Sequence, residues 1–422
     1  MIKKKSLWIY ILVYPVTIAV CILLLVLSAC VPGEKIQKNC EKSAMYFKER
    51  SLYPNIETGK DHTKLDFYAD CILLNIVYSI DEKRPFCSVI EDRFYEQENR
   101  DIETSLMKNV FEEVGAESDY SRYWHGSIVF LRPMLCFTDI EGIYRIIGWV
   151  FFILLLAIEF LLIRGKDYEM AVIYPIALWL VSASVVVRCI EYSVPFLLMQ
   201  IMIILFLILG EKRDRIIFCL CAVSGVLVSF MDFLTAETIT ITVPLFFVWM
   251  KRKKTGSVLF YIKAVCLWGI GYVSMFLTKW GISALFLGRS VLSDTVERAI
   301  GRMEGTAFFS VAKNIYTLFP ISEFTAIGIK AVCVCLFAGL LAVTAVMIRQ
   351  ETLRTKEQTI AGALTPVLFM TVPYLRYVVL GNHSYLHSFF TYRAQLITIL
   401  VMLSYAKPLG SRIVNFLRQR NS

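Results

Sequence analysis

Apolar runs with the length of a membrane-spanning helix recur along nearly the whole of this 422-residue chain. A bilayer core takes about 20 consecutive apolar residues per helix, so these runs leave few soluble folds open. They lack the alternation of polar and apolar residues that marks the strands of outer-membrane barrels. The predicted spans are 7–31, 141–163, 170–187, 192–210, 216–231, 237–250, 258–281, 326–348, 360–378 and 390–406. The sequence therefore predicts an all-α polytopic membrane protein with about ten transmembrane helices.

Charge is scarce and unevenly placed. Only 19% of the residues are charged and 57% are apolar, whereas soluble domains carry about a quarter charged residues. Lys and Arg gather in the predicted inner segments, as at 251–254, while the three short outer loops near 188–191, 232–236 and 379–389 hold only Arg188. This asymmetry places both termini in the cytoplasm. The net charge of +9 then follows from topology, and no nucleic-acid partner is predicted.

The first span, residues 1–31, has features of a targeting segment. Lysines at 3–5 precede the apolar run, and Leu-Ser-Ala-Cys at 27–30 resembles a bacterial lipoprotein cleavage box. The apolar stretch of about 25 residues is long for the core of a signal peptide. The prediction is therefore an uncleaved signal anchor.

A charged segment, 32–127, interrupts the apolar pattern directly after the first span. With the short apolar piece 127–137, which contains an Arg-Pro pair, it forms a predicted outer loop over 32–140. We expect a helix over 35–48 and a second helix over 65–80 that lies along the membrane. The piece 127–137 is too short to span and is predicted to be interfacial or re-entrant.

The rest of the chain is predicted to be a multipass bundle over 141–406 and a cytoplasmic tail over 407–422. A smaller outer loop, about 282–325, contains an amphipathic stretch at 293–303 that could cover the first loop. A multipass protein whose large loop follows its first helix is expected to carry its site in that loop.

Asp66 and Asp70 are the candidate catalytic residues. At i and i+4 on a helix, their carboxylates would share one face beside apolar neighbours. A partly desolvated carboxylate in a cleft can act as a general base toward a hydroxyl. The alternative is that the two residues are solvated or cap a helix.

Residues 120–126, Tyr-Ser-Arg-Tyr-Trp-His-Gly, form a second candidate region. Aromatic faces such as that of Trp124 can stack on sugar rings, and Arg122 and Arg132 can grip a phosphate. His125 could donate to an oxygen or serve as an acid or base. The alternative interpretation is an ordinary aromatic belt at the membrane interface.

Further ionisable residues gather at the outer ends of the predicted spans, where polar groups tend to face a cavity or pair with each other. The candidates for substrate binding among them are Asp232, Arg376, His383, His387 and Arg393. Basic residues outnumber acidic ones in this ring, which suits an anionic headgroup. The two histidines, at i and i+4, could share a metal ion, but no third ligand is evident. No metal site is predicted, and a divalent ion is the one cofactor left open.

The architecture resembles the GT-C superfamily, polytopic glycosyltransferases that use polyprenyl-phosphate-linked sugars. An inside N-terminus, a first span, a large first outer loop with acidic residues and many later spans carry the resemblance, which covers most of the chain. The strings at 120–126, 131–135, 232–235 and 382–385 also resemble those of uncharacterised multipass proteins from Gram-positive bacteria. The absence of a phosphate-binding P-loop and of GxGxxG disfavours a nucleotide-sugar donor.

The resemblance implies a protein of the bacterial cell membrane that takes a polyprenyl-phosphate-linked sugar and a cell-envelope glycan or lipid acceptor. It further implies a single displacement with inversion. Asp66 or Asp70 would deprotonate the acceptor hydroxyl. Arg122, Arg132 or Arg393 would hold the phosphate as charge develops on it.

Two other function classes stay open. A transporter or flippase of lipid-linked glycans would need polar groups that continue to the midplane, or two matching halves. Here the ionisable residues gather mostly at span ends, and no internal repeat is visible. A glycan polymerase or ligase of the O-antigen type shares the lipid-linked substrate, but its large outer loop usually comes late in the chain.

Overall fold

The computed structural model describes residues 4–98, 101–209, 214–252, 257–287, 297–298, 300–354 and 360–406. Nearly all regular structure in these ranges is helical, and the two strands have two residues each. In the first third of the chain the elements are α1 (Lys4–Ala29), α2 (Gly33–Lys48), η1 (Asp61–Thr63), α3 (Phe67–Tyr78), α4 (Pro85–Glu91), β1 (Arg93–Phe94), α5 (Ile102–Glu112), β2 (Ser118–Asp119) and α6 (Ile128–Met134). The later elements are α7 (Ile140–Arg164), α8 (Tyr168–Leu180), α9 (Ala183–Val186), α10 (Ile190–Leu209), α11 (Asp214–Met231), α12 (Ile239–Lys251), α13 (Val258–Leu287), α15 (Ala307–Leu318), α16 (Ile327–Arg354), α17 (Ile360–Val379), α18 (Gly381–Leu386), α19 (Ser388–Thr391) and η2 (Tyr392–Gln395).

Seven of the described helices are long and apolar enough to cross a membrane. They are Tyr10–Ala29, Ile140–Arg164, Ile190–Leu209, Asp214–Met231, Val258–Leu287, Ile327–Gln350 and Ser388–Ala406. Three other predicted spans correspond to shorter apolar helices, Tyr168–Leu180, Ile239–Lys251 and Leu364–Val379. The predicted span 170–187 is interrupted after Leu180, where Ser182 takes a left-handed backbone. The all-α membrane class is confirmed, and seven of the about ten expected spans have full length.

The long helices have apolar faces that nothing in the described protein covers. On α7, Trp149 and Phe160 are 66% and 61% exposed, and on α16 Leu336 is 61% exposed. Soluble monomers rarely expose contiguous apolar surface of this extent. A lipid bilayer is therefore the environment that these faces fit. Inside the bundle, α10 packs against α7, α11 and α12.

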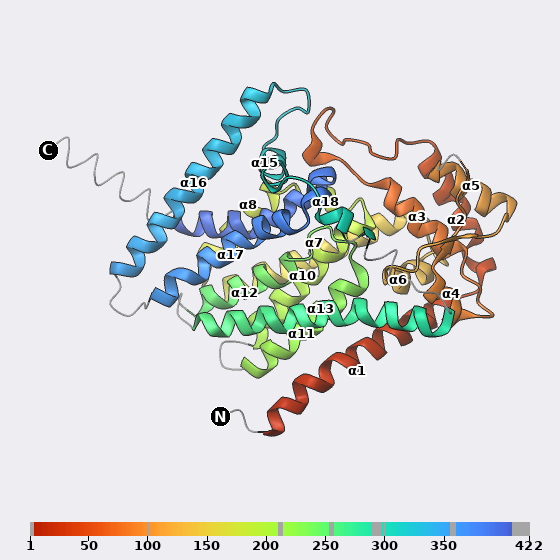
Figure 1. The fold of residues 1–422 in the computed structure, drawn as a ribbon, viewed down its shortest axis with the longest axis horizontal. Coiled ribbons are helices and arrows are strands. Elements are labelled where there is room, and N and C mark those ends of the chain that lie inside the picture. Colours follow the sequence, from red (N-terminus) through yellow and green to blue (C-terminus); the bar gives the residue numbers. More distant parts are fainter. Residues whose placement is uncertain are drawn as a thin grey trace.

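Residues 33–134, here named the cap, gather at one end of the bundle (Figure 1). The helices predicted at 35–48 and 65–80 are confirmed as α2 and α3, and the short piece after 127 forms α6. Two of these helices, α3 and α5, begin at an aspartate. Asp101, for example, accepts a hydrogen bond from the amide of Thr104 and so satisfies one of the free N–H groups of α5. Of the predicted amphipathic stretch 293–303, residues 293–296 and 299 lie outside the described residues.

Buried polar side chains connect the cap to the membrane helices. Arg132 of α6 donates to the carbonyl of Val31, which lies between the end of α1 and the cap, at 2.7 Å from Nη2, and within the cap to the carbonyl of Val77. The indole nitrogen of Trp124 donates to the carbonyl of Met275 on α13 at 2.8 Å. Because an unpaired buried donor is costly, these contacts set the position of the cap on the bundle.

Helices α11 and α13 approach each other closely at two glycines. A Cβ on Gly225 would lie 2.0 Å from the carbonyl oxygen of Trp268, and a Cβ on Gly271 would lie 2.5 Å from that of Ala222. Small residues of this kind let membrane helices pack backbone against backbone. α13 carries residues of the site described below, so this contact also positions the site.

We expect Gly271→Ala to destabilise the protein by about 1–3 kcal/mol, because the added methyl group overpacks the contact between the helices. Gly269→Ala is the matched control, since a Cβ there meets nothing within 4 Å. Thermal unfolding of the purified variants in detergent measures both effects. Equal midpoints for the two variants would contradict the close approach.

Candidate functional site

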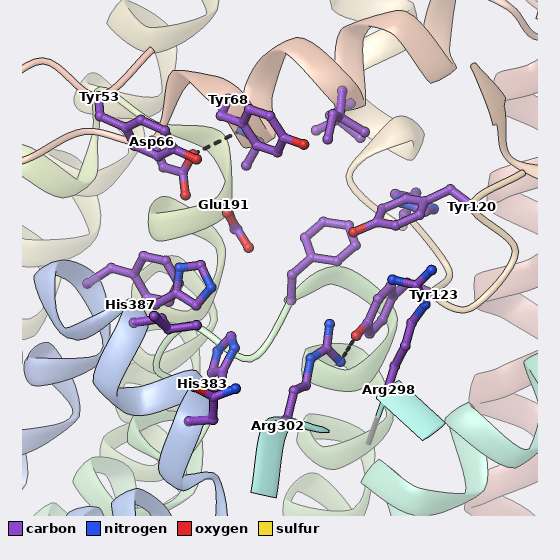
Figure 2. Close-up of a pocket in the computed structure, with 18 of the residues that line it drawn as sticks. Tyr53, Asp66, Tyr68, Tyr120, Tyr123, Glu191, Arg298, Arg302, His383 and His387 are labelled. Carbon is purple, nitrogen blue, oxygen red and sulfur yellow. Dashed lines mark hydrogen bonds between the residues drawn. The ribbon is translucent and has the colours of Figure 1, made fainter. Parts of the chain in front are cut away.

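A pocket of about 440 Å³ lies between the cap and the bundle, with six aromatic rings, two carboxylates, two arginines and three of the four histidines in its lining (Figure 2). Its walls come from separate parts of the chain: the start of α3, the 120–125 turn, the start of α10, the residues Arg298, Gly301 and Arg302, and α18. We call it the polar pocket. Its ionisable and aromatic lining residues are Tyr53, Asp66, Tyr68, Tyr120, Tyr123, His125, Glu191, Phe233, Arg298, Arg302, His383, His387 and Phe390.

The two predicted catalytic carboxylates have different surroundings. Asp66 is the N-cap of α3, accepts a hydrogen bond from the amide of Ala69 at 3.0 Å and lines the polar pocket. Asp70 is buried outside that lining, where it accepts from the hydroxyl of Tyr144 at 2.5 Å and from the amide of Ile190 at 3.1 Å. The structure thus brings Asp66 to the pocket and not Asp70. The reason is that Asp70 is engaged by contacts that hold α7 and α10 against the cap.

Burial raises the pKa of the Asp66 carboxyl to about 6, and the hydrogen bond from Ala69 offsets only part of that rise. A second carboxylate, Glu191 at the start of α10, faces the same cavity (Figure 2). Asp66 is therefore a stronger proton acceptor than an exposed aspartate. This is the property that a general base working near neutral pH requires.

Cations line the pocket away from these carboxylates. Arg302 is hydrogen-bonded to the hydroxyl of Tyr123, with its guanidinium carbon 5.2 Å from the centre of that ring. Arg298 and His383 lie in the same part of the lining (Figure 2). Charged groups of opposite sign thus occupy different walls of one cavity.

A second cavity of about 220 Å³, here named the apolar pocket, adjoins the first and shares Tyr123, Arg298 and Arg302 with it. Its other lining residues are mostly apolar, and five of them come from α13. They are Tyr272, Val273, Phe276, Leu277 and Trp280, together with Arg122, Leu234, Met303 and Leu380. Val273 and Leu277 are 53% and 56% exposed, so the apolar pocket opens on the lipid-facing side of α13.

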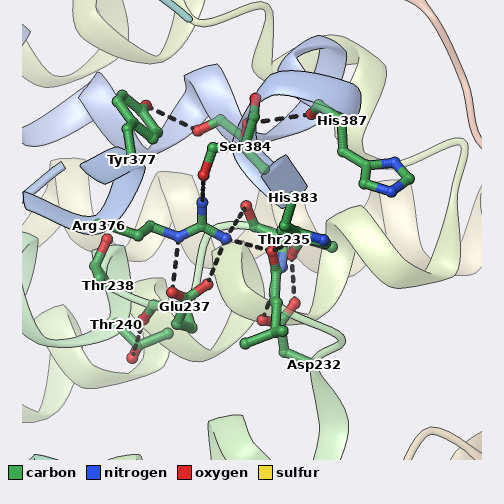
Figure 3. A network of polar contacts seen from close by, with 12 residues as sticks. Asp232, Thr235, Glu237, Thr238, Thr240, Arg376, Tyr377, His383, Ser384 and His387 are labelled. Atoms are coloured by element: carbon green, nitrogen blue, oxygen red, sulfur yellow. Dashed lines mark hydrogen bonds and ion pairs between the residues drawn. The ribbon is translucent and has the colours of Figure 1, made fainter. Parts of the chain in front are cut away.

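Asp232 and Arg376 belong to a polar network behind the polar pocket (Figure 3). Asp232 accepts from the amide of Thr235 at 3.1 Å, and the Nε of Arg376 donates to Glu237 at 2.7 Å. Arg376 also donates to the carbonyl of Leu234, which lies 3.0 Å from Nε2 of His383. The network holds the 232–237 turn against α17 and α18 and so positions His383. The predicted binding residues Asp232 and Arg376 do not themselves line the polar pocket.

Three other predicted binding residues are engaged in the fold. Arg132 and Trp124 form the contacts between cap and bundle described above, and neither lines the polar pocket. Arg393 is buried and donates to the carbonyls of Phe389 and His62 at 3.1 and 3.2 Å. These large polar side chains look like ligand-binding groups in the sequence, but each of them donates to backbone carbonyls of the fold.

Of the remaining predicted residues, Arg122 lines the apolar pocket, and His125, His383 and His387 line the polar one. The rings of His383 and His387 lie 4.8 Å apart. Among the residues that the structure describes, no three His, Cys, Asp or Glu side chains are grouped so that they could hold a metal ion.

Sequence reasoning did not select Tyr53, Tyr68, Arg298 or Arg302. The first two lie in a turn-rich stretch and a semi-apolar helix without a motif, and their rings stack at 6.1 Å. The two arginines lie in the stretch 293–303, whose amphipathic pattern was the one available signal. No family model, curated protein or solved structure matches this chain. What the pocket can do is therefore inferred from its own chemistry.

The surroundings of Asp70 lead to a pH-dependent contribution to stability. Burial raises the pKa of its carboxyl from 3.8 to about 7 in spite of the hydrogen bonds that it accepts. The folded state therefore holds this proton more tightly than the unfolded state, and the stability that it supplies is lost as the pH rises from about 4 through about 7. We expect Asp70→Asn, which resembles the protonated form, to lose less stability over this interval. The unfolding midpoints of the wild type and the variant, measured across this pH range, report the loss of stability. If the midpoints of the two proteins depend on pH in the same way, the expectation is contradicted.

Proposed function

We propose that this chain is a membrane glycosyltransferase that moves a sugar from a polyprenyl-phosphate donor to a cell-envelope glycan or lipid acceptor. The proposal includes the outer face of a bacterial cell membrane as its place of action and cytoplasmic positions for both termini. The observation that carries it is the junction of the two pockets at Tyr123, Arg298 and Arg302. A lipid-linked phosphate needs a chamber of this kind, in which an apolar chain site meets cations and a polar cavity.

The apolar pocket suits the lipid part of the donor. Phe276, Leu277 and Trp280 offer apolar surface on the side of α13 that a bilayer would cover. A prenyl chain could enter there from the lipid without crossing water. Arg298 and Arg302, at the border with the polar pocket, would then lie beside the phosphate, where arginine forms charge-assisted hydrogen bonds.

The polar pocket suits the sugar. Aromatic rings with polar edges line it, and the stacked Tyr53 and Tyr68 present ring faces near Asp66 (Figure 2). Sugar rings pack on such faces, while carboxylates accept hydrogen bonds from hydroxyl groups. The volume of about 440 Å³ lies within the range of small-molecule sites.

The reaction would be a single displacement. Asp66 takes the proton of the acceptor hydroxyl as that oxygen bonds to the anomeric carbon, and the bond from this carbon to the phosphate oxygen breaks. The phosphate oxygen leaves with the electron pair. Arg298 and Arg302 stabilise the charge that grows on it, which lowers the barrier because the interaction is strongest in the transition state. Asp66 then returns its proton to water.

We expect Asp66→Asn to lower the rate of transfer by about 10²- to 10⁴-fold, the usual contribution of a general base. The assay is release of polyprenyl phosphate from a polyprenyl-phosphate sugar by the purified protein in nanodiscs. Asp70→Asn is the matched control. It makes the same change one turn away, outside the pocket lining, and should keep transfer.

Full activity of Asp66→Asn would remove Asp66 from the mechanism. Binding of the donor without turnover, equal in the wild type and both variants, would favour a flippase or carrier. Loss of activity in both variants, with both still folded, would show that transfer also requires Asp70, although this residue lies outside the pocket lining.

The apolar pocket leads to a separate test. Phe276→Ala should weaken binding of a long-chain polyprenyl phosphate by about tenfold or more, since a buried aromatic side chain contributes about 1.5–3 kcal/mol. Binding of a short, water-soluble prenyl phosphate should change little. Ile270→Ala on the same helix is the control, because Ile270 is 54% exposed and lies outside this pocket. A loss equal for both chain lengths would argue against a chain site.

A further inference from the structure

His125 lines the polar pocket and has a positive φ. Its φ is 45°, in the left-handed region that non-glycine residues seldom adopt, and the φ of its neighbour in space, Asp92, is 48°. The next residue, Gly126, donates its amide to the carbonyl of Phe230 at 2.9 Å. A Cβ on Gly126 would lie 2.5 Å from that oxygen, so only glycine permits the contact. The fold thus holds the imidazole in place at some conformational cost, as occurs at functional sites.

A buried ion pair lies behind the imidazole. Oδ2 of Asp92 is 2.6 Å from Nζ of Lys279 and 3.2 Å from Nδ1 of His125, and all three side chains are at most 1% exposed. Lys279 also donates to the carbonyls of Val89 and Ile90 at 3.1 and 3.0 Å. Asp92 and Lys279 balance each other in charge, so the imidazole can be neutral or positive without leaving an uncompensated carboxylate.

The ring nitrogen of His125 that is not beside Asp92, Nε2, is buried and has no hydrogen-bond partner among the described residues, and the side chain lines the polar pocket. Buried polar nitrogens are nearly always paired, so this one points to a ligand. Of the other two pocket histidines, His383 has a partner, since its Nε2 lies 3.0 Å from the carbonyl of Leu234. His387 also has a buried ring nitrogen without a partner, Nδ1, but among the described residues no carboxylate pairs with its ring as Asp92 does with that of His125.

We propose that His125 is the protonatable anion ligand of the polar pocket, taking up one proton when a prenyl phosphate binds. The imidazolium then lies between Asp92, at Nδ1, and the phosphate, at Nε2. The proton comes from the solvent and returns to it when the phosphate leaves. The identity of the ligand rests on the proposed glycosyltransferase function.

The groups around His125 give the direction of the effect. Burial lowers the pKa of the ring, and Lys279 and Arg122 lower it further, while Asp92 raises it. Tyr120 and Tyr123 also face the ring, with centroids at 4.9 and 6.4 Å. The free protein therefore has a neutral His125 at neutral pH. A bound phosphate adds a second anion and raises the pKa, so affinity is highest below the pKa of the free protein.

As the pH rises between the pKa of the free and that of the bound protein, affinity falls by at most about tenfold per pH unit. The experiment is titration calorimetry of the full chain in nanodiscs with farnesyl methyl phosphate. This prenyl phosphodiester keeps a constant charge near neutral pH and so contributes no proton of its own. Measurements in two buffers of different ionisation enthalpy count the protons, and we expect uptake of about one proton per ligand.

His125→Gln keeps a hydrogen-bonding side chain but cannot take up a proton. We expect this variant to bind more weakly, with no proton uptake and no dependence of affinity on pH in this window. His387→Gln is the matched control from the same pocket and should keep the uptake. Asp92→Asn, which removes the anion behind the ring, should reduce the uptake. If it does not fold, His125→Gln still decides the question.

Binding without proton uptake in the wild type, or uptake that persists in His125→Gln, would overturn the proposal. Proton-coupled binding without sugar transfer would support the role of His125 and reject the glycosyltransferase function. Sugar transfer without proton uptake would support the glycosyltransferase function and reject the role of His125. Absence of any binding would reject both proposals.

Discussion

The buried ion pair between Asp92 of the cap and Lys279 of α13 is the contact on which the arrangement of the site depends. It joins residues 187 positions apart and is accompanied by two backbone carbonyls that accept from the same ammonium. Burying two charges is expensive, and such a pair persists only with good geometry and further hydrogen bonds. Loss of one partner would leave an unpaired charge between the cap and the bundle. The pair therefore ties the cap to α13 at this one position.

With the cap held in that position, elements that are far apart in the sequence form the walls of the polar pocket. Asp66 enters from the start of α3 and Arg302 from the segment before α15. Charges interact more strongly where protein replaces water, so the charged groups of this lining would act strongly on a ligand that fills the cavity. Because the carboxylates and the arginines line different walls, a ligand would bind in one orientation. Its hydroxyl groups would lie beside the carboxylates and its anionic group beside the arginines.

Much of the polar chemistry near the site supports it from behind. Arg376, Glu237 and Asp232 hold the 232–237 turn, and Arg132 anchors α6. A buried donor of this type needs a hydrogen-bond partner, because an unpaired one costs about 1–3 kcal/mol. Arg376 and Arg132 donate to groups of the protein itself. His125, whose Nε2 is buried without a partner in the described protein, differs from them in this respect.

The membrane class, the position of the large polar segment and the helices α2 and α3 could all be predicted from the amino-acid sequence. These depend on the length and periodicity of apolar residues, which are local properties. The sequence also indicated the regions of the site, since Asp66 and His125 were both among the candidates. It did not separate Asp66, which caps α3, from Asp70 in the first turn, because the contacts that bury Asp70 come from α7 and α10.

Which polar groups line the pocket depends on tertiary packing and could not be predicted from the sequence. Asp92, Lys279 and His125 lie far apart in the chain, and no spacing rule connects them. The same holds for Arg302 and Tyr123, which meet across the two pockets. Whether an arginine binds a ligand or a backbone carbonyl depends on which carbonyls the packing leaves unpaired. That information resides in contacts between distant segments and not in the local pattern.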